Sequence, residues 1–215
     1  MEGPRWGPAS GGAPTGLVVV LHGLGADGFD LIDLAPGWGK AVPGALFVAP
    51  HAPEACDMAP YGRQWFSLQD RTPARVAAGV EAAASVLAGW IDAERQKLGL
   101  GWGRVAVMGF SQGAMMGLRL GLVEARGMAA VLAYSGRLTT PATPAPGPAP
   151  RFLLVHGEDD EVVPVAGSRG AEAALAAAGL AVEFVARPGL GHGIDEAGIA
   201  LGALALQRAL PGTPE

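Results

Sequence analysis

The residue types that could do chemistry in this chain centre on one serine. Ser111 lies in the stretch Gly109-Phe110-Ser111-Gln112-Gly113, where an apolar run gives way to a helix-like pattern. A G-x-S-x-G sequence between a strand and a helix is typical of a nucleophile elbow, a sharp turn that exposes the serine oxygen at the edge of a sheet. Glycine is expected on both sides because side chains there would collide with the neighbouring strand and helix. Glycine is common in this chain, so the position of the pattern supports the prediction more than the pattern itself.

A serine is a weak nucleophile unless a base removes its proton. The chain has four histidines, and three of them stand at or just beyond the ends of apolar runs: His22, His51 and His156. The fourth, His192, lies in the glycine-rich stretch "RPGLGHGI". In elbow-type enzymes the chain order is serine, acid, histidine. His192 follows Ser111 with room for an acid between them, and it is therefore the predicted base.

A histidine base needs a carboxylate that fixes its tautomer and stabilises the imidazolium ion. The stretch "HGEDDEVVP" follows a strand-like run and offers four acids: Glu158, Asp159, Asp160 and Glu161. Most of them must belong to a solvated acidic turn, and position alone does not choose among them. Asp195 is a weaker candidate because it has the position of a helix N-cap.

A tetrahedral intermediate also needs N–H donors for its oxyanion. One donor is expected from Gln112, the residue after the nucleophile, and the other from the loop "LHGLGADG" at 21–28. A phosphate-binding role for this loop is disfavoured, because its spacing matches neither G-x-G-x-x-G nor the P-loop. No histidine pair or Cys/His cluster has the spacing of metal ligands, so neither a metal nor another cofactor is expected.

These residues stand beside short, nearly continuous apolar runs that predict strands buried on both faces. The runs are 16–23, 45–50, 104–110, 129–136, 151–157 and 182–187. Helical patterns lie between many of them, at 73–98, 112–126, 168–178 and 195–209. Strands that alternate with helices predict an α/β protein whose mostly parallel sheet has helices on both faces. The proline-rich stretch 139–150 is too short for a helix pair, so no lid domain is expected.

Composition limits the class of protein and its partners. The chain has 215 residues, a formal net charge of −5 and one cysteine, Cys56. The absence of a basic stripe argues against nucleic acid as a partner, and a lone cysteine gives no sign of an oxidising compartment. We expect a cytoplasmic protein without stable membrane insertion, made of a flexible lead-in at 1–15 and a single domain at 16–215. The sequence does not indicate an oligomeric state.

Taken together, these motifs resemble the carboxylesterase/phospholipase family of α/β-hydrolases, which includes the acyl-protein thioesterases. The resemblance extends from about residue 16 to residue 209. It rests on five motifs in the family's order: "LHGLGADG", "RQWFSL", "GFSQGA", "HGEDDEVVP" and "GLGHGI". Glu161 stands where the family often has proline, and the loop 51–72 matches weakly outside Trp65 and Phe66.

The resemblance implies a role for several residues. The family's acid precedes a Val-Pro pair as D-x-x-V-P, which selects Asp160. Leu24 would supply the second oxyanion N–H, and Trp65 and Phe66 would line the substrate cleft. The implied activity is hydrolysis of short- to medium-chain acyl esters, with thioesters or lysophospholipids as further candidates. The alternatives are a serine peptidase or acyltransferase of the same fold and, with less support, a non-catalytic module that binds an acyl ligand.

Overall fold

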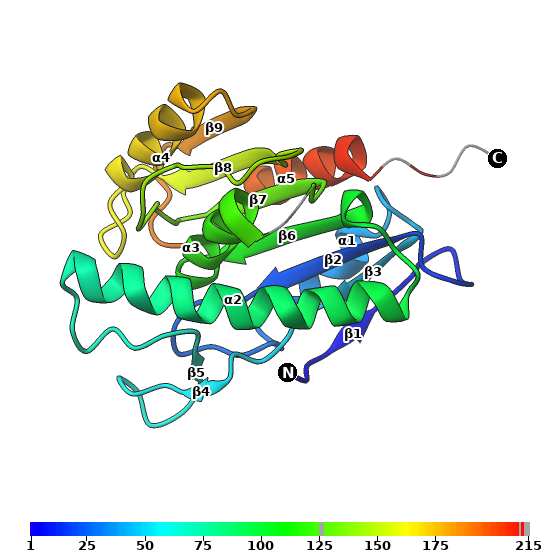
Figure 1. Ribbon diagram of the computed structural model, residues 1–215, viewed down its shortest axis with the longest axis horizontal. Helices are drawn as coiled ribbons and strands as arrows, with labels where there is room; N and C mark the ends of the chain where they lie inside the picture. The colour runs from blue at the N-terminus through cyan, green and yellow to red at the C-terminus, as the bar shows by residue number, and fades with distance from the viewer. Residues whose placement is uncertain (125–126, 211, 213–215) are drawn as a thin grey trace.

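The frame of the molecule is a seven-stranded sheet in the order β1-β3-β2-β6-β7-β8-β9, seen in a computed structural model that describes residues 1–124, 127–210 and 212 (Figure 1). All neighbouring strands are parallel except β1, which runs antiparallel to β3. The strands are β1 (Arg5–Trp6), β2 (Gly16–Leu21), β3 (Ala45–Val48), β6 (Val105–Phe110), β7 (Ala130–Tyr134), β8 (Arg151–Gly157) and β9 (Val182–Arg187). Each of the six apolar runs in the sequence thus corresponds to a strand of this sheet.

Helices cover both faces of the sheet, as the sequence predicts (Figure 1). On one face lie α2 (Pro73–Lys97), α3 (Gln112–Arg119) and α4 (Ala166–Ala177), and their buried side chains pack together with one side of the strands. On the other face lie α1 (Ala35–Trp38) and α5 (Glu196–Ala209), which enclose a second apolar cluster. Because both faces are covered, the central strands carry apolar residues at consecutive positions rather than at alternate ones.

The helices differ from the predicted ranges mainly at their ends. The range 112–126 contains α3, which ends at Arg119, and a π-helical turn, η3 (Leu120–Glu124); residues 125–126 lie outside the described part of the chain. Two 3-10 turns, η1 (Ile32–Leu34) and η2 (Trp102–Arg104), complete the helical elements. A small hairpin joins β4 (Glu54–Ala55) to β5 (Arg63–Gln64) in the loop 51–72, which the apolar runs did not predict.

The structure differs from the expectation that residues 1–15 are a flexible lead-in. β1 pairs with β3, so the lead-in adds a strand to the sheet. Trp90 Nε1 donates a hydrogen bond to the carbonyl of Met1 at 3.0 Å. Arg5 forms an ion pair at 2.6 Å with Glu94, whose side chain is buried. The glycine and proline content indicated flexibility, whereas these contacts join the start of the segment to β3 and α2.

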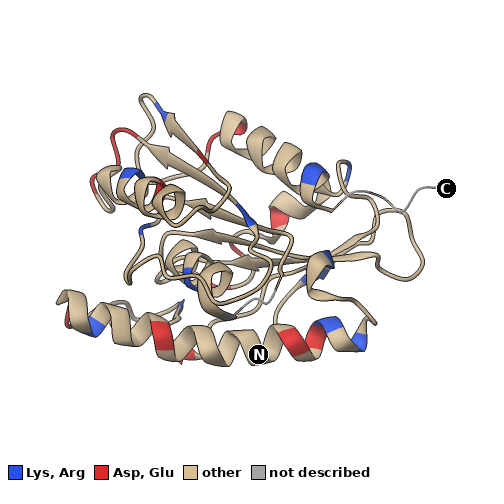
Figure 2. Ribbon diagram, turned by 45° about the horizontal axis from the view of Figure 1, so that its top comes forward, with Lys and Arg blue, Asp and Glu red and all other residues tan. Residues whose placement is uncertain are grey.

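The long helix α2 has the length and mean hydropathy of a membrane-spanning segment, and in the described residues it alone passes that test. It lies along the sheet, and buried residues along its length, among them Val80, Leu87 and Ile91, join the main apolar cluster. The core helix of a globular protein has the same composition. Figure 2 shows basic residues near both ends of this helix with acidic residues between them, and charged residues scattered over the rest of the molecule.

Candidate active site

The turn between β6 and α3 has the shape that the G-x-S-x-G pattern predicts. Ser111 has φ 53° and ψ −112°, a conformation in which a residue other than glycine is strained. A Cβ atom at Gly109 would lie 2.2 Å from the carbonyl oxygen of Gly113. A Cβ atom at Gly113 would lie 2.2 Å from the carbonyl oxygen of Leu21, at the end of β2. The two glycines therefore let α3 approach β6 and β2 closely enough to form the sharp turn.

Ser111 and His192 line the same cavity, which has a volume of about 350 Å³ and lies at the carboxyl ends of the parallel strands. Leu24 and Gln112 also line it, so four of the residues that the sequence singled out meet there. The remaining walls come from the ends of β2 and β6, from α3, from the loop after β5 and the start of α2, and from the segments after β7 and β8: Gly23, Leu68, Arg71, Val76, Phe110, Met115, Arg137, Val162, Val163 and Pro164. The aromatic ring of Phe110 lies against the imidazole of His192, with 4.8 Å between ring centroids.

His192 and Asp160 form a direct pair. The Nδ1 atom of His192 lies 2.7 Å from Oδ2 of Asp160, and the carboxylate itself is fully buried. The loop that carries His192 can come this close because Gly157 has no side chain: a Cβ atom there would lie 2.1 Å from the carbonyl oxygen of Leu190. A proton on Nδ1 that points at the carboxylate leaves Nε2 free to act as a base.

Asp160 is held by more groups than His192 alone. Its Oδ1 accepts hydrogen bonds from the N–H groups of Val162 and Val163 at 2.9 and 2.8 Å. Burial raises the pKa of the Asp160 carboxyl, but the hydrogen bond from His192, followed by the one from Val163, outweighs it, so this pKa lies below its ordinary value. The carboxylate is therefore charged at neutral pH and can stabilise a protonated His192.

A second histidine contacts the same carboxylate. His156, at the end of β8, is completely buried, and its Nε2 lies 3.1 Å from Oδ2 of Asp160 and 2.7 Å from the carbonyl oxygen of Val163. Because both neighbours are acceptors, Nε2 must carry the proton. Its Nδ1 lies 2.7 Å from the hydroxyl of Ser168. The sequence placed His156 at the end of a strand, and the four-residue spacing to Asp160 was the available signal for this contact.

The other acids near the site have different surroundings. Asp195 caps α5: its Oδ1 accepts the N–H of Gly198 at 2.7 Å, and its Oδ2 pairs with Arg187 at 2.9 Å. The hydrogen bond from Arg187 is the main reason why the pKa of Asp195 lies below its ordinary value. Glu158 forms an ion pair with Arg169 at the surface, at 3.2 Å, and both Asp159 and Glu161 are exposed. Of the four acids in "EDDE", Asp160 is the one that contacts His192.

The two predicted oxyanion donors line the same cavity as the serine. Gln112 is the first residue of α3, where an N–H group has no carbonyl partner within the helix. Leu24 follows Gly23, whose Cα approaches Ser111 so closely that an added Cβ would lie 3.4 Å from the serine Cβ. His22, just before them, is buried: its Nδ1 faces the carbonyl of Gly23 at 2.7 Å, and its Nε2 accepts the N–H of Ala52 at 3.1 Å. Burial is the main cause that lowers the pKa of His22, which is therefore neutral.

Trp65 and Phe66 lie under the cavity wall rather than in it. Both are almost completely buried, and neither lines the 350 Å³ cavity. The indole N–H of Trp65 donates to the carbonyl of His22 at 2.9 Å. The side chain of Gln112 accepts the N–H of Trp65 at 2.8 Å and donates to the carbonyl of Phe66 at 2.7 Å. The family resemblance implied that these aromatic residues line the cleft; in the structure both are buried beside it, and Leu68 and Arg71 line the cavity.

A search of the described residues for three or more His, Cys, Asp or Glu side chains that could hold a metal ion finds no such group.

Known proteins resemble this chain in sequence and in fold. Residues 9–201 match the family model described as phospholipase/carboxylesterase. The chain is 32% identical over 180 residues to the esterase YpfH of Escherichia coli K12, which covers 83% of this chain and 76% of that protein. The structure of the present chain is similar to the crystal structure of esterase PE8, with a TM-score of 0.89 and 38% identity. The match covers 97% of this chain and 99% of the PE8 chain. Acyl-protein thioesterase 2 of Zea mays shares the fold, with a TM-score of 0.67, 21% identity and coverage of 96% and 98%. The chain thus belongs to the phospholipase/carboxylesterase family of α/β-hydrolases, and it is a carboxylic-ester hydrolase.

Proposed function

We propose that the chain hydrolyses short- to medium-chain acyl esters through an acyl-enzyme, with Ser111 as nucleophile, His192 as base and Asp160 as acid. The observation that carries this proposal is the meeting of Ser111 and His192 at one cavity, with His192 bonded to a buried carboxylate. Ester carbonyls are attacked by a serine oxygen once a base accepts its proton. The strained backbone of Ser111 supports the same assignment, because such strain is retained at functional sites.

The proposed reaction has two halves. Nε2 of His192 takes the proton of the Ser111 hydroxyl while the serine oxygen bonds to the acyl carbon, and the negative charge that develops on the carbonyl oxygen is held by the N–H groups of Leu24 and Gln112. His192 then gives its proton to the leaving alkoxide as the carbon–oxygen bond breaks. A water molecule repeats the attack on the acyl-enzyme, again through His192, and releases the acid. Asp160 keeps its negative charge throughout and stabilises the imidazolium ion.

The nucleophile can be tested by labelling and by substitution together. A fluorophosphonate probe should modify the wild-type protein, and peptide mapping should place the label on Ser111. Ser111→Ala should lose the label and lower kcat by several orders of magnitude, up to the factor of about 10⁶ by which loss of the serine slows subtilisin. Ser85→Ala, an exposed serine on α2, is the control and should retain both. A folded Ser111→Ala protein with more than about a tenth of wild-type activity would exclude Ser111 as the nucleophile.

The same residues would also serve a serine peptidase or an acyltransferase of this fold. A panel of ester, thioester, amide and acyl-acceptor substrates, each assayed at equal concentration, separates these activities. Hydrolysis of esters above all others supports the proposed function. A non-catalytic module that only binds acyl ligands would hydrolyse none of these substrates, and the fluorophosphonate probe would not label it.

The proposed organisation is a single catalytic domain over residues 16–215 acting in the cytoplasm on a small-molecule ester. The lead-in contributes a strand to this unit but no residue to the cavity. The proposed site uses no metal or other cofactor, and chelation by EDTA should leave the ester hydrolysis rate unchanged.

A further inference from the structure

The cavity beside Ser111 carries positive charge although the chain as a whole is acidic. The full sequence has a formal net charge of −5, with 20 acidic and 15 basic residues. The described residues that line the cavity nevertheless include two arginines, Arg71 and Arg137, and neither aspartate nor glutamate. Asp160 is the nearest acid in the mechanism, but its side chain is buried behind His192 rather than facing the cavity. The local charge is thus opposite in sign to that of the molecule.

Neither arginine is neutralised within the described part of the chain. The guanidinium of Arg71 makes two weak contacts, with the carbonyl of Leu68 at 3.4 Å and with the sulfur of Met58 at 3.9 Å, and neither partner is charged. For Arg137, no ion pair or hydrogen bond of its guanidinium to another described residue is present. Both arginines are exposed. Arg75, two residues after the start of α2, differs from them because it pairs with Asp70 at 3.8 Å.

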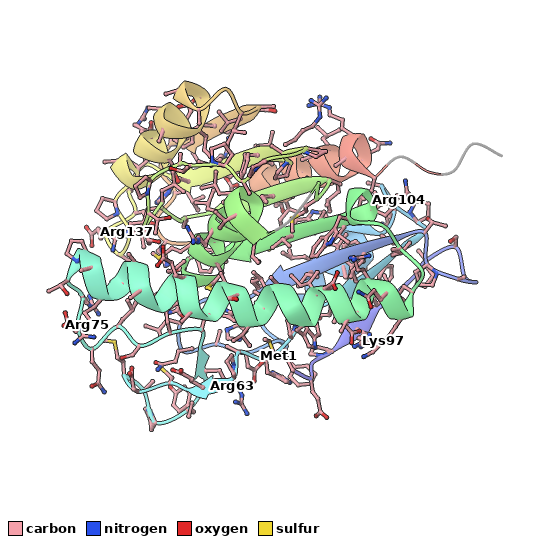
Figure 3. All side chains as sticks on the ribbon, in the orientation of Figure 1. Met1, Arg63, Arg75, Lys97, Arg104 and Arg137 are labelled. Carbon is pink, nitrogen blue, oxygen red and sulfur yellow. The ribbon has the colours of Figure 1, made fainter. Side chains whose placement is uncertain are left out.

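The two cations reach the cavity from segments that are far apart in the chain. Arg71 immediately precedes α2, whereas Arg137 follows β7, and Figure 3 labels Arg137 at the end of the molecule where α2 begins. Between them the cavity surface is largely apolar, with Leu68, Val76 and Met115 among its residues. An apolar surface favours an acyl chain, and unpaired guanidinium groups at its rim favour a carboxylate.

We propose that the preferred substrate of this enzyme is an acyl ester that carries a carboxylate, which Arg71 and Arg137 bind at the rim of the cavity. This inference rests on the proposed function, because it assigns the substrate class of the same site. The carboxylate belongs either to the acyl part, as in a half-ester of a dicarboxylic acid, or to the alcohol part. Positive charge at a cleft also raises the rate at which anionic substrates arrive, and added salt weakens that effect.

Two matched pairs of esters test the proposal. For the acyl side, 4-nitrophenyl hydrogen adipate is compared with its neutral methyl ester, 4-nitrophenyl methyl adipate. For the alcohol side, 4-(hexanoyloxy)benzoate is compared with its methyl ester, with acid release followed by pH-stat. Within the adipate pair both the reacting carbonyl and the leaving group, 4-nitrophenoxide, are the same. Within the benzoate pair the leaving phenoxides differ in basicity, so the contribution of the charge is taken from the change in the ratio of the two kcat/KM values, anionic over neutral, between wild type and variants.

The variants are Arg71→Gln, Arg137→Gln and the double substitution, with Arg75→Gln as the control. The control removes the same charge from a residue that lies close to Arg71 in the chain but does not line the cavity. Two exposed charge contacts together correspond to a change of about 2-fold to 30-fold in kcat/KM. The ratio for at least one pair should exceed one in the wild type and fall by about that factor in the double variant. It should stay constant in Arg75→Gln and decrease towards one in 0.5 M salt, where the screening length is only a few ångströms.

The proposal is overturned if the neutral ester reacts faster in both pairs, if the double variant leaves the ratio unchanged, or if Arg75→Gln lowers it as much. The neutral esters separate this failure from a failure of the proposed function. If Ser111→Ala abolishes hydrolysis of the neutral esters but the ratio of kcat/KM values does not depend on the arginines, the proposed substrate class is wrong and the proposed esterase function stands. If the neutral and the anionic esters are both untouched by the wild type, the proposed esterase function fails with it.

Discussion

The replacement of Gly113 by alanine tests the geometry on which the proposed nucleophile depends. The added Cβ would lie 2.2 Å from the carbonyl oxygen of Leu21 and 2.8 Å from that of His22. Both are backbone atoms at the end of β2, which is paired with strands on both sides and cannot yield as a flexible side chain would. Helix α3 must therefore move away from the sheet, and Ser111 and the N–H of Gln112 must move with it.

The same helix provides a matched control at Gly117. A Cβ there would lie 3.5 Å from the nearest methyl groups of Val107 and Val131, which is ordinary van der Waals contact. Alanine in place of glycine inside a helix gains about 1 kcal/mol. Overpacking costs typically 1–3 kcal/mol, roughly the upper end of that range for a collision with backbone. Gly113→Ala should therefore lose about 2 kcal/mol net, and Gly117→Ala should gain up to about 1 kcal/mol.

These free energies translate into opposite shifts of the melting temperature. For a chain of this length, each kcal/mol corresponds to about 2–4 °C, so Tm should fall by about 4–8 °C in Gly113→Ala and rise by up to about 4 °C in Gly117→Ala. A displacement of about 1 Å at the reacting groups lowers the rate by about 100-fold, so kcat for 4-nitrophenyl butyrate should fall by that order in Gly113→Ala alone. If Gly113→Ala melts at the wild-type temperature with full activity, the close contact between α3 and β2 does not position Ser111.

Further predictions concern the acid, a buried histidine and the substrate. Asp160→Asn should lower kcat/KM by about 10⁴, as loss of the acid does in other serine triads, whereas Asp159→Asn should have little effect; the reverse order would place the acid one residue earlier. The lowered pKa of His22 means that the unfolded chain binds more protons below about pH 6.5, so the free energy of unfolding in urea should decrease as pH falls from 7 to 5. This decrease should be smaller in His22→Gln, and an unchanged slope would show that His22 is not responsible. The kcat/KM for 4-nitrophenyl esters should peak between about four and eight acyl carbons, without a jump at micelle formation, because a lidless cavity covers few methylenes; a preference for sixteen carbons would reveal a deep tunnel.

The sequence predicted the elements around Ser111 because local rules determine them. Consecutive apolar residues are required in strands that are covered on both faces, and this requirement located the strands that carry the site. The glycine at 109 is required by a collision with the backbone of Gly113, four positions along the chain, whereas the collision at Gly113 is with Leu21 at the end of β2. The sequence also predicted Asp195 as a helix N-cap, because capping depends on the capping residue and on the three residues that follow it.

Contacts between segments far apart in the chain were not predictable in the same way. Whether Arg71 and Arg137 face one cavity depends on how the start of α2 meets the segment after β7, and no spacing in the sequence expresses that arrangement. The composition of the lead-in indicated flexibility. Composition could not reveal the ion pair of Arg5 with Glu94, because these residues are 89 positions apart in the chain. The resemblance to a family selected Asp160, where the four neighbouring acids left the choice open, and the hydrogen bond to His192 is consistent with that selection.

Gln112 joins the loop 51–72 to the proposed reacting groups. Its backbone N–H is the proposed oxyanion donor, and its buried side-chain amide bonds to the N–H of Trp65 and the carbonyl of Phe66. Trp65 in turn bonds to the carbonyl of His22, two residues before Leu24, the other proposed donor. The loop that bears Leu68 and Arg71 is thus attached to Gln112 and to the segment before Leu24 through buried hydrogen bonds, each of which would leave an unsatisfied polar group if broken. A change in this loop therefore reaches the chemistry as well as substrate binding, because the same few residues fix the position of both.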